Sequence, residues 1–451
     1  MFNTDVTFIV IALLLITVFA GIHVAAALGI AAMVGLWMVF GDFNQMIFFI
    51  GSTAYEALRD YVFAVVPMFM LMGEFISRSG AADDIFNGIN NSLKRVPGRL
   101  AHATVLGNAI FAFVTGTSLA SATAFTRIAY PQMARHGYNR SFALGSIAGS
   151  ACLGMLIPPS LFMIVWGILT EQSIGTLFFA GVMPGFLLAG FMIVFIFAVA
   201  IVRPEMVGEG RRARALSADV APRPLDGEDT TSGTSTPMVS FIGIGFVIVF
   251  VLGGIWVGWF TPTEGAGVGA VVGLALGLAK GMKLRDVYDT VLSVGYTSVP
   301  IMILLFAAQL YSRMLALAGV GVAVQDAFVG TGFGPLGIFL MMVAIWFVMG
   351  MVIDSVSIML LTVPIFAPLA VTLGYDPVAF ALMGILAIEA GILTPPFGLL
   401  VYAVKAVSPD PDTTMGEVFV GATPYWIMIL MVMMAVYFVP EIATWFPKQM
   451  L

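Results

Sequence analysis

Four short segments of this 451-residue chain are suited to binding a small cation, because they combine oxygen-bearing side chains with residues that interrupt helices. Successive prolines leave helix carbonyls without amide partners, since proline has no N–H to donate. Hydroxyls and freed carbonyls together make a hard-oxygen site suited to Na⁺. The alternative interpretation of each Pro-Pro pair is a simple kink in a packed helix. The segments are Gly-Thr-Ser-Leu-Ala-Ser-Ala-Thr (116–123), Gly-Met-Leu-Ile-Pro-Pro-Ser (154–160), Gly-Met-Val-Ile-Asp-Ser (350–355) and Gly-Ile-Leu-Thr-Pro-Pro-Phe-Gly (391–398).

Three charged residues lie in or near these segments. Asp354 interrupts an apolar run, where a carboxylate is costly at membrane depth and therefore a candidate for ion coordination or substrate contact. The alternative is that Asp354 caps a helix. Glu389 precedes Gly391 and could organise that segment, accept a proton or pair with a donor. Arg127 could attract an anionic substrate, or its side chain could simply extend toward the membrane surface.

The composition places these segments in a membrane protein. Hydrophobic residues make up 60% of the chain and charged residues 10%, against about 45–50% and about 25% in soluble proteins. Because the mean hydropathy is +1.04, most of the surface must face the lipid bilayer. Long apolar runs without alternation exclude a β-barrel and predict an all-α polytopic membrane protein. A net charge of −6 gives no basic surface for nucleic acid.

Apolar runs of suitable length predict the spanning helices. Between them, residues 203–237 are rich in charge, Pro, Gly, Ser and Thr, and indicate a solvated linker in the middle of the chain. Helices are expected near 7–22, 24–40, 60–77, 141–170, 175–202, 238–260, 263–280, 287–311, 377–405 and 422–445.

The chain repeats itself at an offset of 237 residues. Without a gap, this offset places Ser118 on Ser355, Gly154 on Gly391, and Pro158-Pro159 on Pro395-Pro396. Paired Gly and Pro residues at constant spacing indicate an internal duplication, even in an apolar sequence. Each half therefore supplies one pair of the candidate segments.

The distribution of Lys and Arg indicates that the two repeats are inverted. Basic residues flank the stretch 100–134 on both sides, so both of its ends are expected in the cytoplasm. Two arms of about 15 residues barely cross a ~30 Å core, which favours a re-entrant hairpin. The matching hairpin, 336–372, lies in a region without Lys or Arg between Arg313 and Lys405 and is expected to open to the opposite side. Arg59 and Arg313 fall on the outer side and disagree with this scheme.

Some other features are interpreted as structural. Thr261-Pro-Thr-Glu264 predicts a capping box at the start of a helix. Cys152 cannot form an internal disulfide and is expected to be buried. The three histidines are scattered, so no metal site beyond sodium is expected. The sequence contains no phosphate-binding loop, so nothing in it indicates ATP hydrolysis.

These motifs together resemble the large membrane subunit of tripartite ATP-independent periplasmic (TRAP) transporters, over nearly the whole chain. The motifs are Gly116-Thr-Ser-x-Ala-Ser-Ala-Thr, Pro131-Gln-Met-Ala-Arg-His-Gly-Tyr, Gly154-x-Leu-Ile-Pro-Pro-Ser, Thr261-Pro-Thr-Glu, Ile353-Asp-Ser-x-Ser, Gly374-Tyr-Asp-Pro and Gly391-Ile-Leu-Thr-Pro-Pro-x-Gly.

The resemblance implies sodium-driven uptake of an organic acid such as a C4-dicarboxylate or sialic acid, across the bacterial inner membrane, with no enzymatic activity and no cofactor. It implies two partners: a periplasmic solute-binding protein and a separate small four-helix membrane subunit. It also implies an elevator mechanism, in which hairpins and broken helices move against a scaffold. The expected division is scaffold 1–57, first repeat 58–202 with broken helix 141–170, cytoplasmic linker 203–237, scaffold 238–284, and second repeat 285–447 with broken helix 377–405.

Carried over by position, the resemblance implies two sodium sites with substrate between them. The first would use Thr117, Ser118 and Ser121 with backbone near Gly154 and Pro158. The second would use Asp354 and Ser355 with Gly391, Thr394 and Pro395. Candidate substrate contacts are Ser160, Phe397 and Arg127.

Three rival functions are weighed. A purely structural membrane scaffold would not need two polar breaks. A stand-alone sodium/dicarboxylate symporter shares the broad architecture but needs no binding protein. An intramembrane protease would use Asp354 or a serine tip, yet Asp354 lacks a partner aspartate in a Tyr-Asp pair and the tip lacks a Gly-x-Ser-Gly run. The transporter prediction is therefore favoured.

Overall fold

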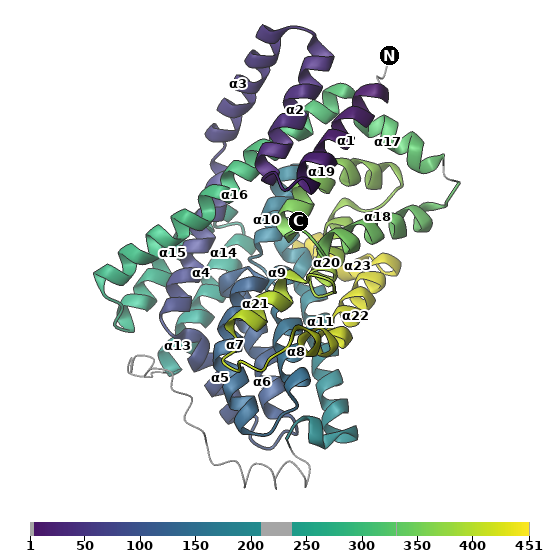
Figure 1. Cartoon of the computed structure of the whole chain (residues 1–451). Helices are drawn as coiled ribbons and strands as arrows, with labels where there is room; N and C mark the ends of the chain where they lie inside the picture. The colour runs from purple at the N-terminus through teal and green to yellow at the C-terminus, as the bar shows by residue number, and fades with distance from the viewer. Residues whose placement is uncertain (1–3, 209–236, 331, 451) are drawn as a thin grey trace.

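The computed structural model describes residues 4–208, 237–330 and 332–450. Regular structure in these ranges is helical, apart from one isolated β-bridge between Tyr138 and Val207 (Figure 1). The all-α prediction is confirmed. Most of the predicted linker, residues 209–236, lies outside the described residues.

The chain before the linker forms the helices of the first half. They are α1 (Thr4–Phe19), α2 (Val24–Phe40), α3 (Phe43–Arg59), α4 (Val65–Arg78), α5 (Ala81–Ser92), α6 (Arg99–Thr115), α7 (Ser118–Arg135), α8 (Arg140–Ala151), α9 (Leu153–Leu156), α10 (Leu161–Thr170) and α11 (Ile174–Val202).

The second half begins with α13 (Pro237–Phe246), which continues through a π-helical stretch into α14 (Gly253–Trp256). The remaining helices are α15 (Pro262–Ala279), α16 (Leu284–Ala318), α17 (Val320–Val329), α18 (Pro335–Gly350), α19 (Ser355–Thr372), α20 (Pro377–Gly391), α21 (Leu399–Val407), α22 (Met415–Phe438) and α23 (Glu441–Met450).

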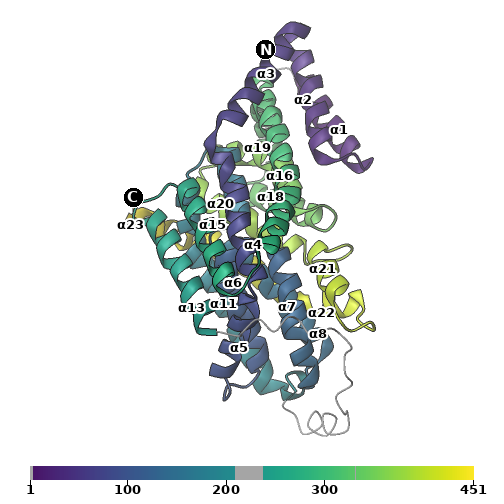
Figure 2. The same cartoon turned by 90° about the vertical axis from the view of Figure 1, so that its left-hand side faces the viewer.

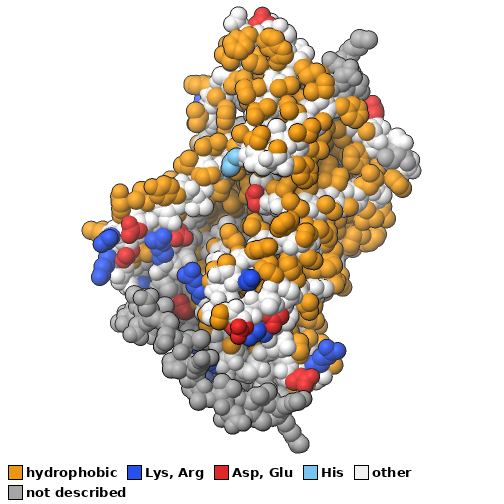
Figure 3. Space-filling model, viewed as in Figure 1, with side chains coloured by type: hydrophobic (Ala, Val, Ile, Leu, Met, Phe, Trp, Pro, Cys, Tyr) orange, Lys and Arg blue, Asp and Glu red, His pale blue; other side chains and the backbone are white. Residues whose placement is uncertain are grey.

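Within the described residues, eight helical stretches are long and apolar enough to cross a membrane, and four shorter helices are also apolar. The face shown in Figure 3 is largely hydrophobic, and most of its Lys and Arg side chains gather toward the lower end of the molecule. A broad apolar surface of this kind faces lipid tails in a multi-pass membrane protein.

Both predicted hairpins and both broken helices are present. Helix α6 turns into α7 across Gly116 and Thr117, and α18 turns into α19 across 351–354. The helices α7 and α19 have 18 residues each and start at the equivalent positions Ser118 and Ser355. The broken helices are interrupted at 157–160 and 392–398, where each Pro-Pro bond is cis. The repeated architecture is therefore confirmed.

The two hairpins approach the centre of the molecule from different ends. Helices α6 and α7 lie toward the lower end in Figure 1, whereas α18 and α19 lie toward the upper right. Outside them, α4 packs along α15, and α16 contacts both α2 and α4. Figure 2 shows α4, α15 and α16 side by side on one flank. This arrangement matches the inverted orientation predicted from the charges.

Some predicted boundaries were wrong. The expected helix 422–445 is instead two helices, α22 and α23, because Pro440 lacks an N–H and forces the preceding Val439 out of the helical region (φ −133°, ψ 76°). The expected helix 287–311 is the longer α16, whose 35 residues extend about 52 Å at 1.5 Å per residue. It extends past the polar residues Arg285, Asp286 and Arg313, at which the predicted apolar run stopped.

Helices α3, α5 and α17 were not predicted, because they are not part of a long apolar run. Helix α5 carries Asp83 and Asp84 in its first turn, and α3 ends in a polar turn with Glu56. The same region explains one of the misplaced charges. Arg313 forms an ion pair with Glu56 and contacts Thr53 Oγ1 at 3.4 Å, so its charge is offset locally.

The two structural interpretations are confirmed. Thr261 Oγ1 accepts a hydrogen bond from the Glu264 amide at 3.3 Å, and the Glu264 carboxylate accepts from the Thr261 amide at 2.8 Å. This reciprocal pair is the predicted capping box of α15. Cys152 is buried, with 2% of its surface exposed.

A buried ion pair ties α5 to the helices that follow the linker. Lys280 Nζ lies 2.5 Å from Asp84 Oδ2, and the two side chains are 6% and 9% exposed. Ser240 Oγ on α13 donates to the same carboxylate at 2.5 Å. Since α5 connects α4 to the first hairpin, this pair fixes where the hairpin begins relative to α13 and α15.

We predict that Asp84→Ala lowers the free energy of unfolding by about 3–5 kcal/mol, because it removes the direct ion-pair partner of the buried Lys280 ammonium. Thermal unfolding of the purified protein in detergent measures the change. The neighbouring Asp83, which is exposed and makes no direct ion pair with Lys280, supplies the matched control, and Asp83→Ala should lose much less stability. Equal stability of the two variants would contradict the structural role of the pair.

Candidate cation and substrate site

The first hairpin tip, residues 116–118, is packed against the first broken helix. Gly116 takes a left-handed conformation (φ 60°) and ends α6, while Thr117 is extended and precedes α7. The Leu161 amide donates to the Gly116 carbonyl at 3.0 Å. A Cβ on Gly154 would lie 2.9 Å from the Thr117 carbonyl oxygen, so only glycine allows this close approach.

The second hairpin meets the second broken helix in a comparable way. A Cβ on Gly350 would lie 2.7 Å from Gly391 Cα, and one on Gly391 would lie 2.8 Å from the Phe347 carbonyl oxygen. The end of α18 therefore touches the end of α20 backbone to backbone. In each repeat, the interrupted helix and the hairpin form one packed unit.

The two tips meet at a common cavity of about 420 Å³, which we call the central cavity. This volume falls in the range of about 300–1,000 Å³ typical of small-molecule sites. Its opposite wall comes from α4 and α16. Its polar lining residues are Glu74, Ser77, Thr115, Thr117, Ser118, Thr123, Ser293, Thr297, Asp354 and Ser355.

The lining chemistry consists of hydroxyls and carboxylates. Glu74 and Asp354 carry its two acidic groups, and no Lys, Arg or His lines the cavity. Glu74 forms an ion pair with Arg78 at 2.7 Å one turn further along α4. The first residues of α7 and α19 both face the cavity, so two positive helix ends are directed into it.

Asp354 caps a helix, as the alternative interpretation of the sequence expected, and it also faces the cavity. Its Oδ2 accepts a hydrogen bond from the Ser357 amide at 3.0 Å, which makes it the N-cap of α19. It also lines the central cavity with the adjacent Ser355. Thr117 occupies the equivalent position before α7 but makes no side-chain cap.

Carbonyls freed by the two breaks find hydroxyl partners. Ser160 Oγ donates to the Met155 carbonyl at 2.5 Å, and Thr394 Oγ1 donates to the Gly391 carbonyl at 2.6 Å. Both hydroxyls are buried. A carbonyl oxygen has two lone pairs, so the Met155 carbonyl can still accept a cation beside its hydroxyl. The Gly391 carbonyl already accepts a second hydrogen bond, from the Thr394 amide at 3.0 Å.

The structure brings only part of the predicted set to the cavity. Thr117, Ser118, Asp354 and Ser355 line it, whereas Ser121 is buried behind the tip and lies 3.3 Å from Thr115 Oγ1. Gly154, Pro158, Ser160, Gly391 and Thr394 are buried in the breaks, and Pro395 is exposed.

Two predicted substrate contacts lie elsewhere. Arg127 is exposed on α7, and Phe397 is 54% exposed in the second break. Neither lines the central cavity. Arg127 therefore matches the alternative reading, a side chain extended away from the site.

Sequence reasoning missed the wall opposite the tips. Glu74 and Ser77 are three residues apart on α4, and Ser293 and Thr297 are four apart on α16. Both spacings place a polar pair on one face of an otherwise apolar helix. That pattern was the available signal, and only the packing shows that both faces meet the same cavity.

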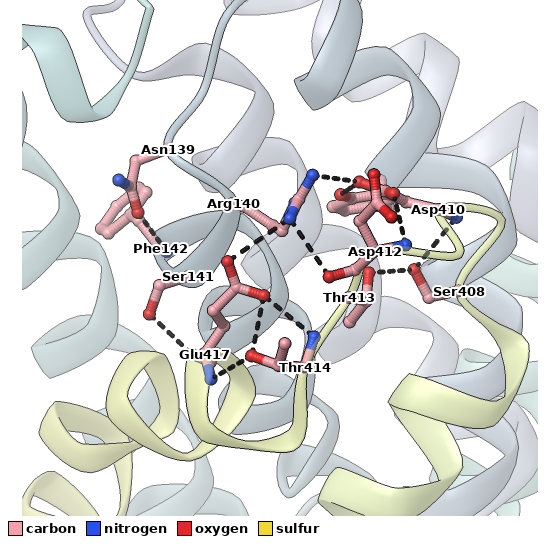
Figure 4. A network of polar contacts seen from close by, with 11 residues as sticks. Asn139, Arg140, Ser141, Phe142, Ser408, Asp410, Asp412, Thr413, Thr414 and Glu417 are labelled. Carbon is pink, nitrogen blue, oxygen red and sulfur yellow. Dashed lines mark hydrogen bonds and ion pairs between the residues drawn. The ribbon is translucent and has the colours of Figure 1, made fainter.

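A polar network joins the two repeats near the start of α8 and the start of α22. Arg140, at the start of α8, lies 2.9 Å from Asp410 and 3.5 Å from Glu417 (Figure 4). Tyr130 on α7 donates to the same Asp410 carboxylate at 2.9 Å, and Ser141 donates to the Glu417 carbonyl at 2.6 Å. The network joins the first repeat to the connection between α21 and α22 in the second.

We predict that Gly391→Ala destabilises the protein by about 1–3 kcal/mol, because its new methyl group would overlap backbone atoms that cannot move independently. Loss of thermal stability in detergent measures this cost. Gly190→Ala on α11 is the matched control, since a Cβ there meets nothing within 4 Å. If both variants unfold alike, the close crossing of α18 and α20 is not a packing constraint.

Comparison with known proteins identifies relatives along nearly the whole chain. The family model described as the DctM component of the tripartite ATP-independent periplasmic transporter matches residues 8–442. The C4-dicarboxylate TRAP transporter large permease protein of Pseudomonas aeruginosa is 31% identical over 87% of this chain and 88% of its own. The ectoine/5-hydroxyectoine large permease protein of Ruegeria pomeroyi is 30% identical over 91% of this chain and 92% of its own.

The fold also resembles a solved transporter structure. The YdaH transporter of Alcanivorax borkumensis aligns with a TM-score of 0.58 at 13% identity, covering 88% of each chain. At this identity the likeness concerns the fold. From the family model and the identity to the large permeases, we conclude that this chain belongs to the DctM-component family of tripartite ATP-independent periplasmic transporters, a family of transporter permeases.

Proposed function

We propose that this protein is the large permease of a sodium-coupled transporter that takes up an organic acid by an elevator mechanism. The observation that supports the proposal most directly is the central cavity, where two helix-hairpin tips meet without any cationic side chain. An organic anion entering this cavity would face Glu74 and Asp354. Cations that enter with the anion would offset this negative charge.

The size of the repulsion makes this coupling strong. Two unit charges 4 Å apart interact by about 4 kcal/mol at an effective dielectric constant of 20. A carboxylate beside Asp354 would be disfavoured by an amount of that order. A Na⁺ bound at each hairpin tip reverses the sign of the field, so substrate affinity depends on bound sodium.

Different helix ends would bind the ion and the substrate. The amino-terminal ends of α7 and α19 face the cavity, and positive helix ends favour the carboxylate of a substrate. The carboxyl-terminal ends of α6 and α18 lie against the breaks, where carbonyl oxygens suit Na⁺. We place the first ion at Thr117, Ser118 and Ser121 near Gly154 and Pro158.

The second ion is placed at Asp354 and Ser355, with the break formed by Gly391, Thr394 and Pro395. Within this set, Asp354 is the residue whose carboxylate lines the cavity and also lies at the start of a helix. Substrate would bind between the tips, against the hydroxyls of α4 and α16 rather than at Arg127 or Phe397.

The packing suits movement of one part against another. The hairpins and broken helices within 58–202 and 285–447 would move together as the transport unit. The helices within 1–57 and 238–284 would serve as scaffold, together with α4 and α16, which belong to the repeats but are neither hairpins nor broken helices. Because the cavity wall on α4 and α16 belongs to the outer helices, substrate would bind where the moving and static parts meet.

Family membership supports the remaining elements of the proposal. The assembly would include a periplasmic solute-binding protein and a small membrane subunit in the bacterial inner membrane. Residues 203–237 would lie in the cytoplasm, in keeping with the basic residues at the start of this segment. The alternative is a stand-alone sodium/dicarboxylate symporter that needs no binding protein.

The cavity chemistry also favours a second substrate class, a zwitterionic carboxylate such as ectoine. Its cationic group would find Glu74 and Asp354, while its carboxylate would find the helix ends. One relative is an ectoine/5-hydroxyectoine permease and another a C4-dicarboxylate permease.

We predict that Asp354→Asn weakens the Na⁺ dependence of uptake at least about tenfold, because even outer partners of a bound metal contribute about 10–100-fold. Asparagine still caps α19, so the effect isolates the charge. Uptake by proteoliposomes is measured across a Na⁺ titration. Asp376→Asn is the matched control, since Asp376 caps α20 without lining the cavity. Unchanged Na⁺ dependence in Asp354→Asn would remove the second ion site.

We expect uptake to fall to background when the cognate periplasmic binding protein is omitted from the proteoliposome assay. Both a labelled C4-dicarboxylate and labelled ectoine are tested, each with an inward Na⁺ gradient. Uptake that persists without the binding protein would establish the stand-alone symporter. Uptake of ectoine but not of the dicarboxylate would select the zwitterionic class.

A further inference from the structure

Glu389 is a buried carboxylate that the proposed sites do not use. It lies in the last turn of α20, and 2% of its surface is exposed. Neither of its carboxylate oxygens has a hydrogen-bond partner among the described residues. Its polar neighbours are the Ser118 hydroxyl and the Cys152 thiol, although neither meets hydrogen-bond geometry.

The helices packed against α20 bring no balancing charge. Helices α9, α10, α11, α18 and α19 contain no ionisable residue. Helix α22 carries three ionisable residues, Glu417, Tyr425 and Tyr437. Glu417 pairs with Arg140. Helix α23 carries Glu441 and Lys448, and no ion pair joins either of them to Glu389 in the described part of the chain.

An unpaired carboxylate in this position is expensive, because burying a charge without a partner costs several kcal/mol. A neutral acid would still need an acceptor for its O–H, and no acceptor lies within bonding geometry. A cation between this carboxylate and the Ser118 hydroxyl would satisfy both groups at once.

The pseudo-symmetry shows why the first site needs this group. At the offset of 237 residues, Asp354 corresponds to Thr117, so the second tip has a carboxylate where the first has only a hydroxyl. At the same offset, Glu389 corresponds to Cys152. These two equivalent residues are neighbours, so the pseudo-twofold axis passes beside them. Glu389 thus reaches the first tip from the second repeat.

We propose that Glu389 supplies the carboxylate of the first sodium site, across the interface between the repeats. Each site then holds one acidic group. The second site has Asp354 from its own tip, and the first site has Glu389 from the opposite repeat. This assignment rests on the proposed sodium coupling. It also makes occupation of the first site a contact that joins the two repeats.

The test removes the charge and then restores it from another position. Glu389→Gln is expected to lower the Hill coefficient for Na⁺ in uptake from about two to about one, since that coefficient is limited by the number of coupled sites. Adding Thr117→Asp to Glu389→Gln returns a carboxylate to the first site and should restore the coefficient. A purely structural role for Glu389 would not be rescued in this way. Cys152→Ser, which changes the other buried neighbour, should behave as the wild type.

A second readout uses Na⁺ alone on the purified permease with its small subunit. The rise in melting temperature in NaCl over choline chloride should shrink in Glu389→Gln and recover in the double variant. If Glu389→Gln does not fold, Glu389→Asp keeps the charge but withdraws it by one methylene and should raise the Na⁺ needed for half-saturation. An unchanged Na⁺ titration in whichever variant folds overturns the assignment.

Two further outcomes separate this inference from the proposed function. The wild-type protein could respond to Na⁺ while the Glu389→Gln variant differs from it only in the pH dependence of uptake. That result would show that Glu389 holds a proton, and it would overturn this inference alone. A wild-type protein without any response to Na⁺ would overturn the proposed function and the assignment together.

Discussion

Backbone oxygens released inside a membrane must find a partner, and this requirement governs the centre of the molecule. Four helical stretches are interrupted there, two at hairpin tips and two at Pro-Pro breaks. Each tip lies against a break so closely that glycine is needed at the contact, as at Gly154 and Gly391. Ser160 and Thr394 take up one freed carbonyl in each break. In the proposed function, the acceptor capacity that remains there would hold the cations.

The duplication supplies two similar half-sites, but their charges differ. Thr117 and Asp354 stand at equivalent helix starts, and only one of them is acidic. Cys152 and Glu389 are also equivalent, and again only one is acidic. The two differences compensate each other if Glu389 serves the first tip. An inverted repeat can therefore keep two cation sites balanced without keeping their sequences alike.

Substrate chemistry follows from the same arrangement. The central cavity lies between the tips and the outer helices α4 and α16, and its polar lining contains no cationic side chain. In the proposed function, recognition of a carboxylate would then depend on helix ends and on bound sodium. The network around Arg140 and Asp410 joins α7 and α8 of the first repeat to the connection between α21 and α22 in the second.

The sequence by itself determined the membrane environment, the duplication, the hairpins and the breaks, because these depend on composition, periodicity and proline chemistry within short segments. The starts of α7 and α19 follow directly from paired residues such as Ser118 and Ser355. It did not determine the cavity wall formed by Glu74 and Thr297, nor the exposure of Arg127. Those depend on which helix faces meet after packing, and on contacts between residues far apart in the chain. Only the tertiary structure brought Glu389 beside Ser118, because no local pattern links a residue of one repeat to the tip of the other.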